Sequence, residues 1–176
     1  MPDHVILYLM VGYPGSGKTT TSRIIAEKTG AVHLWADVKR KEMFETPLHT
    51  YEESRALYAH LNQETALLLA DGKSVIFDTN FNFYKDRQYL REIAAQNNAR
   101  TKLLWVQAPK ELAYERATQK SHGQATRIFG NMSHEDFERI AGHLESPRDN
   151  EEAIILDGTK ITREYVIEKI GLKDSL

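Results

Sequence analysis

The sequence predicts an α/β protein with a five-stranded, mostly parallel sheet between two layers of helices. Short apolar runs alternate with longer helical patterns along the chain, which is typical of βαβ units with right-handed crossovers. The short runs are apolar without interruption, as expected for strands that are covered on both faces. No repeat, proline-rich linker or Gly/Ser tract divides the 176 residues, so we expect a single domain over residues 1–176.

The five expected strands are short segments rich in β-branched and aromatic residues. They are residues 5–11, 31–34, 74–78, 102–106 and 153–156. Ligands of parallel α/β sheets bind beyond the carboxyl ends of the strands. The residues that directly follow these segments are therefore the first candidates for a functional site.

The expected helices lie between the strands and have recognisable ends. Gly30 is suited to end the first helix in the left-handed conformation. Ser133 is suited to cap a helix whose first turn carries Glu135 and Asp136. The predicted helical segments are 18–28, 38–45, 51–70, 84–97, 109–120, 133–145 and 162–170.

Composition excludes several classes of protein. The chain has no cysteine, which rules out disulfides, thiolate catalysis and cysteine-ligated metal. A net charge of −2 gives no overall attraction to nucleic acid, although a local basic groove stays open. The apolar run 5–11 is far shorter than the roughly 20 residues of a membrane helix, and no Lys or Arg precedes it as in a signal peptide. We therefore expect a cytoplasmic protein with no membrane partner.

The most informative motif is GYPGSGKT at residues 12–19. It matches the phosphate-binding pattern GxxxxGK[ST] in full, directly after a predicted strand and before a predicted helix. The glycines let backbone N–H groups turn inward around phosphates, and the helix adds the positive end of its dipole. Lys18 is expected to contact the β- and γ-phosphates and Thr19 to bind Mg²⁺. We assign the nucleotide contacts of this loop to Gly12, Gly15, Ser16, Gly17, Lys18, Thr19 and Thr20.

A dinucleotide-binding loop is the main alternative for these glycines. That loop has the pattern GxGxxG, and Thr20 stands where its third glycine would be. The glycine that allows close helix–strand packing is therefore missing. The motif favours a nucleoside triphosphate bound with magnesium.

Two carboxylates follow predicted strands and are expected at the same edge of the sheet. Asp78 ends the segment 74–78, and a doubly wound sheet brings this strand end beside the phosphate loop, where Asp78 would hold the metal or its water shell. Asp37 follows the second strand and is either the N-cap of the next helix or the acceptor of a substrate hydroxyl proton. Arg40 lies one helical turn further on the same face and would face an anionic part of the substrate.

These motifs in this order resemble the small P-loop kinases. The closest resemblance is to the 5′-hydroxyl polynucleotide kinase domain, with GxPGSGK[ST], then DxxR at Asp37 and Arg40, then DTN beginning at Asp78. The zeta-toxin-type and chloramphenicol phosphotransferase-type kinases are more distant relatives. The resemblance covers roughly residues 5–147 and implies a P-loop NTPase three-layer sandwich of the nucleoside-kinase type with a helical lid.

The resemblance also implies roles for individual residues. Lys18 and Thr19 would bind ATP and Mg²⁺. Asp37 would be the general base and Asp78 the second essential carboxylate. Arg40 would bind an acceptor phosphate.

Kinases of this type close a lid over the nucleotide, and residues 109–132 are the candidate lid. Arg116 would stack on the adenine. The position of the lid residue that stabilises the transferred phosphoryl group falls on Lys120, with Arg127 as the alternative. The turn Asp157-Gly158-Thr159 lies near the adenine edge in this picture, or is a plain turn.

The leading hypothesis is an ATP-dependent kinase that transfers the γ-phosphoryl group to a hydroxyl acceptor. The acceptor is either a nucleic-acid end or a small molecule such as a metabolite, nucleotide sugar or antibiotic. The competing class is a nucleotide-binding module that hydrolyses ATP to drive a partner, for which the sequence shows no glutamine placed to orient a water. The acceptor, the choice between RNA and DNA, and the oligomeric state stay open at this stage.

Overall fold

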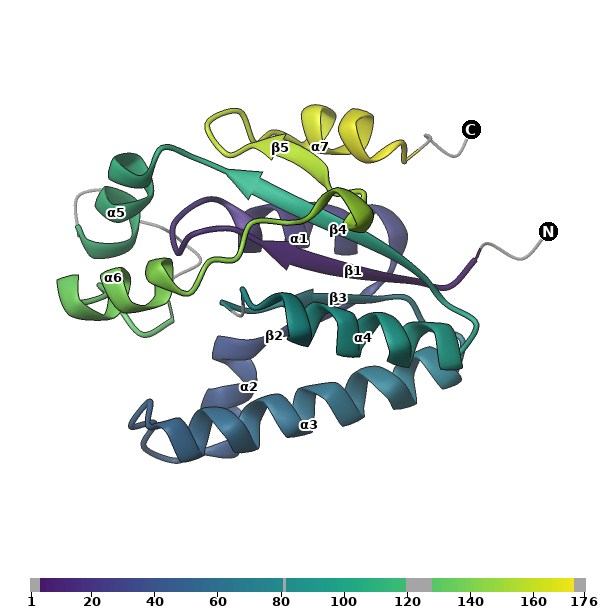
Figure 1. Cartoon of the computed structure of the whole chain (residues 1–176), viewed down its shortest axis with the longest axis horizontal. Coiled ribbons are helices and arrows are strands. Elements are labelled where there is room, and N and C mark those ends of the chain that lie inside the picture. The colour runs from purple at the N-terminus through teal and green to yellow at the C-terminus, as the bar shows by residue number, and fades with distance from the viewer. Residues whose placement is uncertain (1–3, 81, 120–127, 173–176) are drawn as a thin grey trace.

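Five parallel strands form the sheet, in the order β2-β3-β1-β4-β5, with helices on both faces (Figure 1). The computed structural model describes residues 4–80, 82–119 and 128–172. Each of the five predicted strands is present. Their bounds are β1 (Ile6–Val11), β2 (Val32–Trp35), β3 (Val75–Asp78), β4 (Arg100–Gln107) and β5 (Ile154–Asp157).

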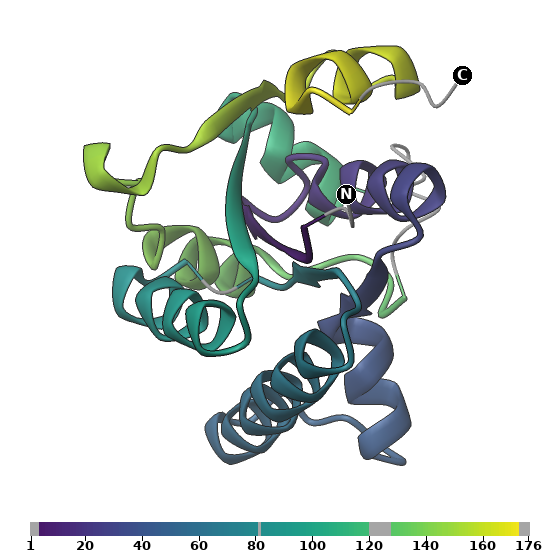
Figure 2. The ribbon, with the colours of Figure 1, turned by 90° about the vertical axis from the view of Figure 1, so that its right-hand side faces the viewer.

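The helices form the two outer layers and a group at the carboxyl end of the strands. They are α1 (Lys18–Thr29), α2 (Ala36–Met43), α3 (Tyr51–Ala70), α4 (Tyr84–Gln96), α5 (Lys110–Thr118), α6 (His134–Gly142), the 3₁₀ turn η2 (Asp149–Glu151) and α7 (Arg163–Ile170). Figure 2 shows α1 and α7 on one side of the sheet and α3 and α4 on the other. In Figure 1, α5 and α6 lie at the end to which the arrowheads of β1 and β4 point.

The central strand β1 supplies buried side chains to both layers. Leu7 and Leu9 pack with residues of α3 and α4, whereas Tyr8 and Met10 pack with residues of α1 and α7. Because β1 is covered on both faces, its sequence is apolar throughout rather than alternating. Its pairing with β3 and β4 brings the loop after Val11 to the edge of the sheet where Asp78 ends β3.

Most predicted helix ends lie within one residue of the structure, and four differ by two or three residues. Gly30 ends α1 with a φ of 74°, and the Ser133 side chain accepts the N–H of Asp136, as predicted. The second helix begins at Ala36, so Asp37 lies inside its first turn and the N-cap alternative for Asp37 is wrong. The helices predicted to end at 45, 120 and 145 end at Met43, Thr118 and Gly142.

Helix α5 of the predicted lid region packs on the phosphate loop together with α6, which follows that region. Ala113 and Ala117 of α5 form a small core with Phe137 and Ala141 of α6, and Tyr13 of the loop packs against it. The contact fixes one side of the loop to α5. Within the described residues, no helix is long and apolar enough to cross a bilayer.

Candidate active site

Glycines shape the phosphate loop between β1 and α1. Gly12, Gly15 and Gly17 have φ values of 154°, 80° and 114°, in the region that favours glycine. A Cβ at Gly12 would lie 2.5 Å from the carbonyl oxygen of Val106, and one at Gly15 would collide with the carbonyl oxygen of Ala113. The loop therefore turns tightly while its neighbours on β4 and α5 pack against its backbone.

The ammonium group of Lys18 is buried inside this loop. Its Nζ donates to the carbonyl oxygens of Gly12 and Tyr13, both at 2.8 Å, and the residue is 6% exposed. Burial lowers the pKa of Lys18 to about 8, although the Asp78 and Asp37 carboxylates act in the opposite direction. Lys18 thus lies within the field of both predicted carboxylates.

Ser16 offers a second sign that the loop is built for a ligand. The residue is fully buried, and among the described residues its Oγ has no hydrogen-bond partner. Buried polar atoms in proteins are normally satisfied. A phosphate oxygen in the loop would supply the missing partner.

Asp78 is held in place by a histidine on the neighbouring strand. The Nε2 atom of His33 lies 2.8 Å from Oδ2 of Asp78, which is 3% exposed. The His33 ring stacks on Trp35 at a centroid distance of 5.8 Å, and the Arg23 guanidinium lies 5.2 Å from the Trp35 ring centre. These contacts fix the Asp78 carboxylate through Oδ2, and Oδ1 takes no part in them.

Asp37 lies in the first turn of α2, in the field of Asp78 and Lys18. Burial raises the pKa of Asp37, and the negative charge of Asp78 adds to the effect, whereas Arg40, His49 and Lys18 oppose it. The structure thus brings together the three groups that the sequence assigned to phosphate, metal and base. A carboxylate with a raised pKa is a better proton acceptor near neutral pH than an ordinary one.

Arg40 is engaged inside the protein. Its NH1 lies 2.5 Å from Oε1 of Glu53, and its NH2 donates to Oγ of Ser54 at 3.0 Å. Glu53 also accepts the backbone N–H groups of Leu48 and His49 at 2.8 and 3.2 Å. Burial alone would raise the pKa of Glu53, but these hydrogen bonds hold it below its usual value. The role of Arg40 as a ligand of an acceptor phosphate stays a prediction.

Asp37 also belongs to a second group of polar side chains. Burial raises the pKa of Tyr58 to about 12, its hydroxyl is hydrogen-bonded to Thr79, and the Asp37 and Asp86 carboxylates also raise this pKa. Asn82 is fully buried, and among the described residues neither of its amide atoms has a partner. We call Asp37, Tyr58, Thr79 and Asp86 the acceptor-side group, and Asn82 follows Thr79 by three residues along the chain.

Arg116 joins the phosphate loop to the loop after β5. Its NH1 donates to the carbonyl oxygen of Gly158 at 3.0 Å and to that of Gly15 at 3.5 Å. The Asp157 side chain accepts from the backbone N–H and hydroxyl of Thr159, so this segment is both a turn and a neighbour of the phosphate loop. Lys120 and Arg127, the two candidates for the catalytic lid residue, lie outside the described residues.

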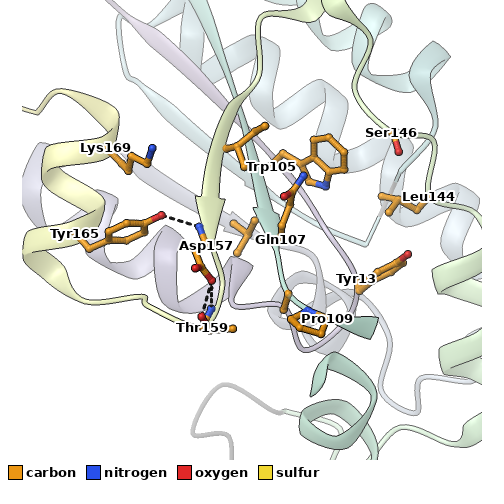
Figure 3. Close-up of a pocket in the computed structure, with 13 residues that line it drawn as sticks. Tyr13, Trp105, Gln107, Pro109, Leu144, Ser146, Asp157, Thr159, Tyr165 and Lys169 are labelled. Carbon is orange, nitrogen blue, oxygen red and sulfur yellow. Dashed lines mark hydrogen bonds between the residues drawn. The ribbon is translucent and has the colours of Figure 1, made fainter. Parts of the chain in front are cut away.

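A cavity of about 770 Å³ lies beside the edge strand β5 rather than over the phosphate loop (Figure 3). Trp105, Leu144 and Ile155 line the apolar part of the cavity. Tyr13 of the phosphate loop also lines it. In Figure 3, Tyr165 and Lys169 lie on the other side of β5 from Trp105. Lys18, Asp37 and Asp78 do not line this cavity, whereas Tyr13 of the phosphate loop and Asp157 and Thr159 of the turn expected near the adenine edge do.

Sequence reasoning did not find His33, Glu53, Asn82 or Asp86. None belongs to a motif, and each acquires its place through a partner that is distant in sequence or through burial. The only signal for Asn82 was its place shortly after the DTN segment.

A family model described as an AAA domain, AAA_33, matches residues 7–147 of the chain. The chain belongs to this AAA domain family. The match includes the phosphate loop, Asp37, Asp78 and Arg116. Sequence comparison with curated proteins finds no match.

Solved structures of kinases share the fold. A sugar kinase from Janibacter sp. HTCC2649 superposes with a TM-score of 0.67 at 22% identity, over 96% of this chain and 92% of that one. The APS kinase CysC of Mycobacterium tuberculosis, solved with AMPPNP and APS, superposes with a TM-score of 0.70 at 19% identity, over 99% and 100% of the two chains. The predicted α/β P-loop NTPase fold is therefore confirmed.

The Pnkp1/Rnl/Hen1 RNA repair complex also contains a similar chain, with a TM-score of 0.64 at 22% identity. The match covers 82% of this chain and 45% of that one. At such identities the likeness establishes the fold that these proteins share. It does not single out a polynucleotide acceptor over a small molecule.

Proposed function

We propose that the protein is an ATP-dependent kinase that transfers the γ-phosphoryl group to the hydroxyl group of an acceptor. The observation that carries the proposal is the grouping of Asp37 with Lys18 and Asp78 at the carboxyl end of the sheet. Lys18 is suited to the phosphates, and Asp37 interacts electrostatically both with Lys18 and with Tyr58 of the acceptor-side group. A module that only hydrolyses ATP has no need of this second group.

Mg²⁺ and ATP fit the donors that the chain presents. Magnesium binds through one or two protein oxygens together with substrate phosphates and waters. The hydroxyl of Thr19 and the carboxylate of Asp78 are oxygen donors of this kind, and the orphaned Ser16 hydroxyl suits a phosphate oxygen. Bound Mg²⁺ would neutralise charge on the phosphates during transfer.

The chain's own groups account for positioning and for the proton. Lys18 exchanges its carbonyl partners for phosphate oxygens and holds the γ-phosphoryl group. Asp37 accepts a hydrogen bond from the acceptor hydroxyl and orients its oxygen in line with the β,γ-bridging bond. As the new P–O bond forms and the bridging P–O bond breaks, the hydroxyl proton passes to Asp37 and the leaving group is ADP. Arg116 keeps the phosphate loop against the loop after β5.

The test is transfer of label from γ-labelled ATP to a pool of hydroxyl compounds and 5′-hydroxyl oligonucleotides, with ATP loss followed in a parallel tube without acceptor. We expect labelled product from the wild type and none from Lys18→Ala. Lys41→Ala, which changes an exposed lysine on α2, is the matched control. Fast ATP loss without acceptor, and no labelled product, would contradict the proposal and indicate the ATP-hydrolysing class.

A further inference from the structure

The hydrogen-bond partners of Arg40 affect which acceptors the site can bind. This arginine is the cation that the kinase resemblance assigns to an acceptor phosphate, yet both its terminal nitrogens contact groups within the protein. Oε1 of Glu53 accepts a hydrogen bond from NH1 at 2.5 Å, and Oγ of Ser54 accepts one from NH2 at 3.0 Å. Arg40 and Glu53 are each 8% exposed. The positive charge of Arg40 is therefore already paired with Glu53 and is not free to pair with an acceptor phosphate.

The partner of Arg40 is itself structural. Glu53 accepts the N–H groups of Leu48 and His49 as well as the guanidinium, so a single carboxylate joins α2, α3 and the loop between them. If Arg40 turned toward an anionic acceptor, a buried carboxylate would lose its counter-charge. Leaving one partner of a buried ion pair alone is strongly unfavourable.

The remaining charges of the acceptor-side group are negative. Asp37 and Asp86 both act on the Tyr58 hydroxyl, and Asp86 is itself acted on by the cations Lys85 and Arg87 and by the carboxylate of Glu145. An anion beside the reacting hydroxyl would therefore meet like charge.

The described cations nearby face other partners. Arg87 is paired with Glu151 at 2.6 Å, and the Lys85 ammonium lies 6.0 Å from the Phe83 ring centre. The ring of His49 packs edge-on against Phe129. Lys18 belongs to the phosphate loop, so each of these groups already contacts another part of the protein.

Asn82 adds an uncharged recognition element. Its backbone carbonyl accepts from the Arg87 guanidinium at 2.9 Å and from the N–H of Glu145 at 3.0 Å, which fixes its place between β3 and α4. Its buried side-chain amide has no partner within the described residues. An amide offers both donors and an acceptor, which is the combination that neighbouring hydroxyl groups satisfy.

We propose that the acceptor is a non-anionic polyhydroxyl compound, neutral or amine-bearing, whose hydroxyl groups contact Asn82 and Asp37, and that Arg40 shapes the site without binding an acceptor phosphate. The inference rests on the proposed kinase function and narrows its substrate class. A phosphate-bearing acceptor, including a polynucleotide end, is the alternative that the test separates.

The test compares acceptors that differ in charge. The full-length protein is incubated with γ-labelled ATP and Mg²⁺ and with matched sets of sugars, polyols and nucleosides, their amino derivatives, their carboxylated or phosphorylated derivatives, and 5′-hydroxyl oligonucleotides. We expect kcat/KM for the best neutral or amino acceptor to exceed that of its anionic counterpart by about tenfold or more. Equal or better transfer to anionic acceptors or oligonucleotides would overturn the inference and leave the kinase function standing. Binding of Mg-ATP with no transfer to any set would overturn the kinase function itself.

Two variants test the residues directly. Glu53→Gln removes the charge that neutralises Arg40, so kcat/KM for anionic acceptors should rise about tenfold relative to neutral ones. Glu42→Gln, an exposed carboxylate on α2 that pairs with Lys39, should leave the ratio unchanged. Asn82→Ala should raise the acceptor KM with little change in the KM for ATP. An unaltered charge preference in a folded Glu53→Gln protein, or an unaltered acceptor KM in Asn82→Ala, would count against the assignment.

Discussion

At the scale of single residues, the buried ammonium of Lys18 links the site to stability. Its pKa of about 8 lies below the ordinary value of 10.5, so the folded protein binds fewer protons than the unfolded chain between these pH values. Stability without nucleotide should therefore rise as the pH increases from 8 to 10.5. Below pH 8 the charged lysine costs on the order of 3 kcal/mol, since one pKa unit is worth about 1.4 kcal/mol.

Lys18→Met should remove this dependence. The variant is expected to be more stable than the wild type at pH 7, by a few kcal/mol, and the difference should shrink toward pH 10.5. Urea unfolding of both proteins between pH 7 and 10.5 measures this difference in the free energy of unfolding, and Lys41→Met, which changes an exposed lysine, is the control. A constant difference between wild type and Lys18→Met at all pH values would show that the ammonium is not penalised by burial.

Asp37 allows a second prediction at this scale. Asp37→Asn keeps the shape of the side chain and removes the proton acceptor, so kcat should fall by about 10²–10⁴ while the Kd for ATP from calorimetry stays near the wild-type value. Because burial and Asp78 raise the pKa of Asp37, the wild-type acid limb of kcat/KM should lie above the ordinary Asp value of 3.8. Parallel loss of ATP binding would instead assign Asp37 a structural role.

The residues that the sequence predicted are those whose roles follow from spacing along the chain. The phosphate loop follows β1, Asp37 lies in the first turn of the helix after β2, and Asp78 ends β3. The topology of a parallel sheet brings these strand ends together. His33 and Glu53 act through partners that are distant in sequence, 45 residues for His33 and Asp78 and 13 for Glu53 and Arg40. Such contacts depend on side-chain packing, which has no period that a single sequence displays.

At the scale of elements, the ion pair between Arg87 of α4 and Glu151 of η2 attaches the segment before β5 to the rest of the fold. Both side chains are fully buried, with contacts of 2.6 and 2.9 Å, and Glu151 also accepts the N–H of Arg148. Glu151→Ala leaves the Arg87 charge buried without its partner, and we expect a loss of about 3–5 kcal/mol in the free energy of unfolding.

Denaturant unfolding checks this prediction against Glu152→Ala, which changes the neighbouring exposed carboxylate. Combining Arg87→Met with Glu151→Leu should recover most of the loss, because both charges are then absent. If the double variant is as unstable as Glu151→Ala, the segment before β5 needs the hydrogen bonds of the ion pair itself, and removing both charges does not replace them.

Strands were easier to predict than helix ends for a physical reason. Burial of β1 and β3 on both faces requires continuous apolar runs, which the sequence shows directly. The start of α2 at Ala36 was missed because Trp35, with no side-chain cap, precedes it where Asp37 offered a conventional N-cap. The end of α6 at Gly142 was missed because His143, Leu144 and Glu145, which follow it, fit a helix equally well.

At the scale of the whole molecule, the phosphate loop connects parts of the chain that are far apart in sequence. Tyr13 packs on α5 and α6, the Lys18 helix packs on α7, and Arg116 ties Gly15 to Gly158. A nucleotide that binds this loop acts on α1, α5 and the loop after β5 together. Mg-ATP should therefore stabilise the entire fold rather than one segment, and thermal unfolding should remain one transition.

At a free Mg-ATP concentration about a hundred times its Kd, the stabilisation should be about 2.7 kcal/mol in the wild type. Arg116→Ala at the same nucleotide concentration should show a smaller rise in Tm, because the loop after β5 is no longer tied to the phosphate loop and Kd increases. Arg139→Ala, which removes an exposed arginine paired with Asp136 on α6, should behave like the wild type. An undiminished shift in Arg116→Ala would show that this bridge takes no part in nucleotide binding, and that the phosphate loop alone determines the affinity for ATP.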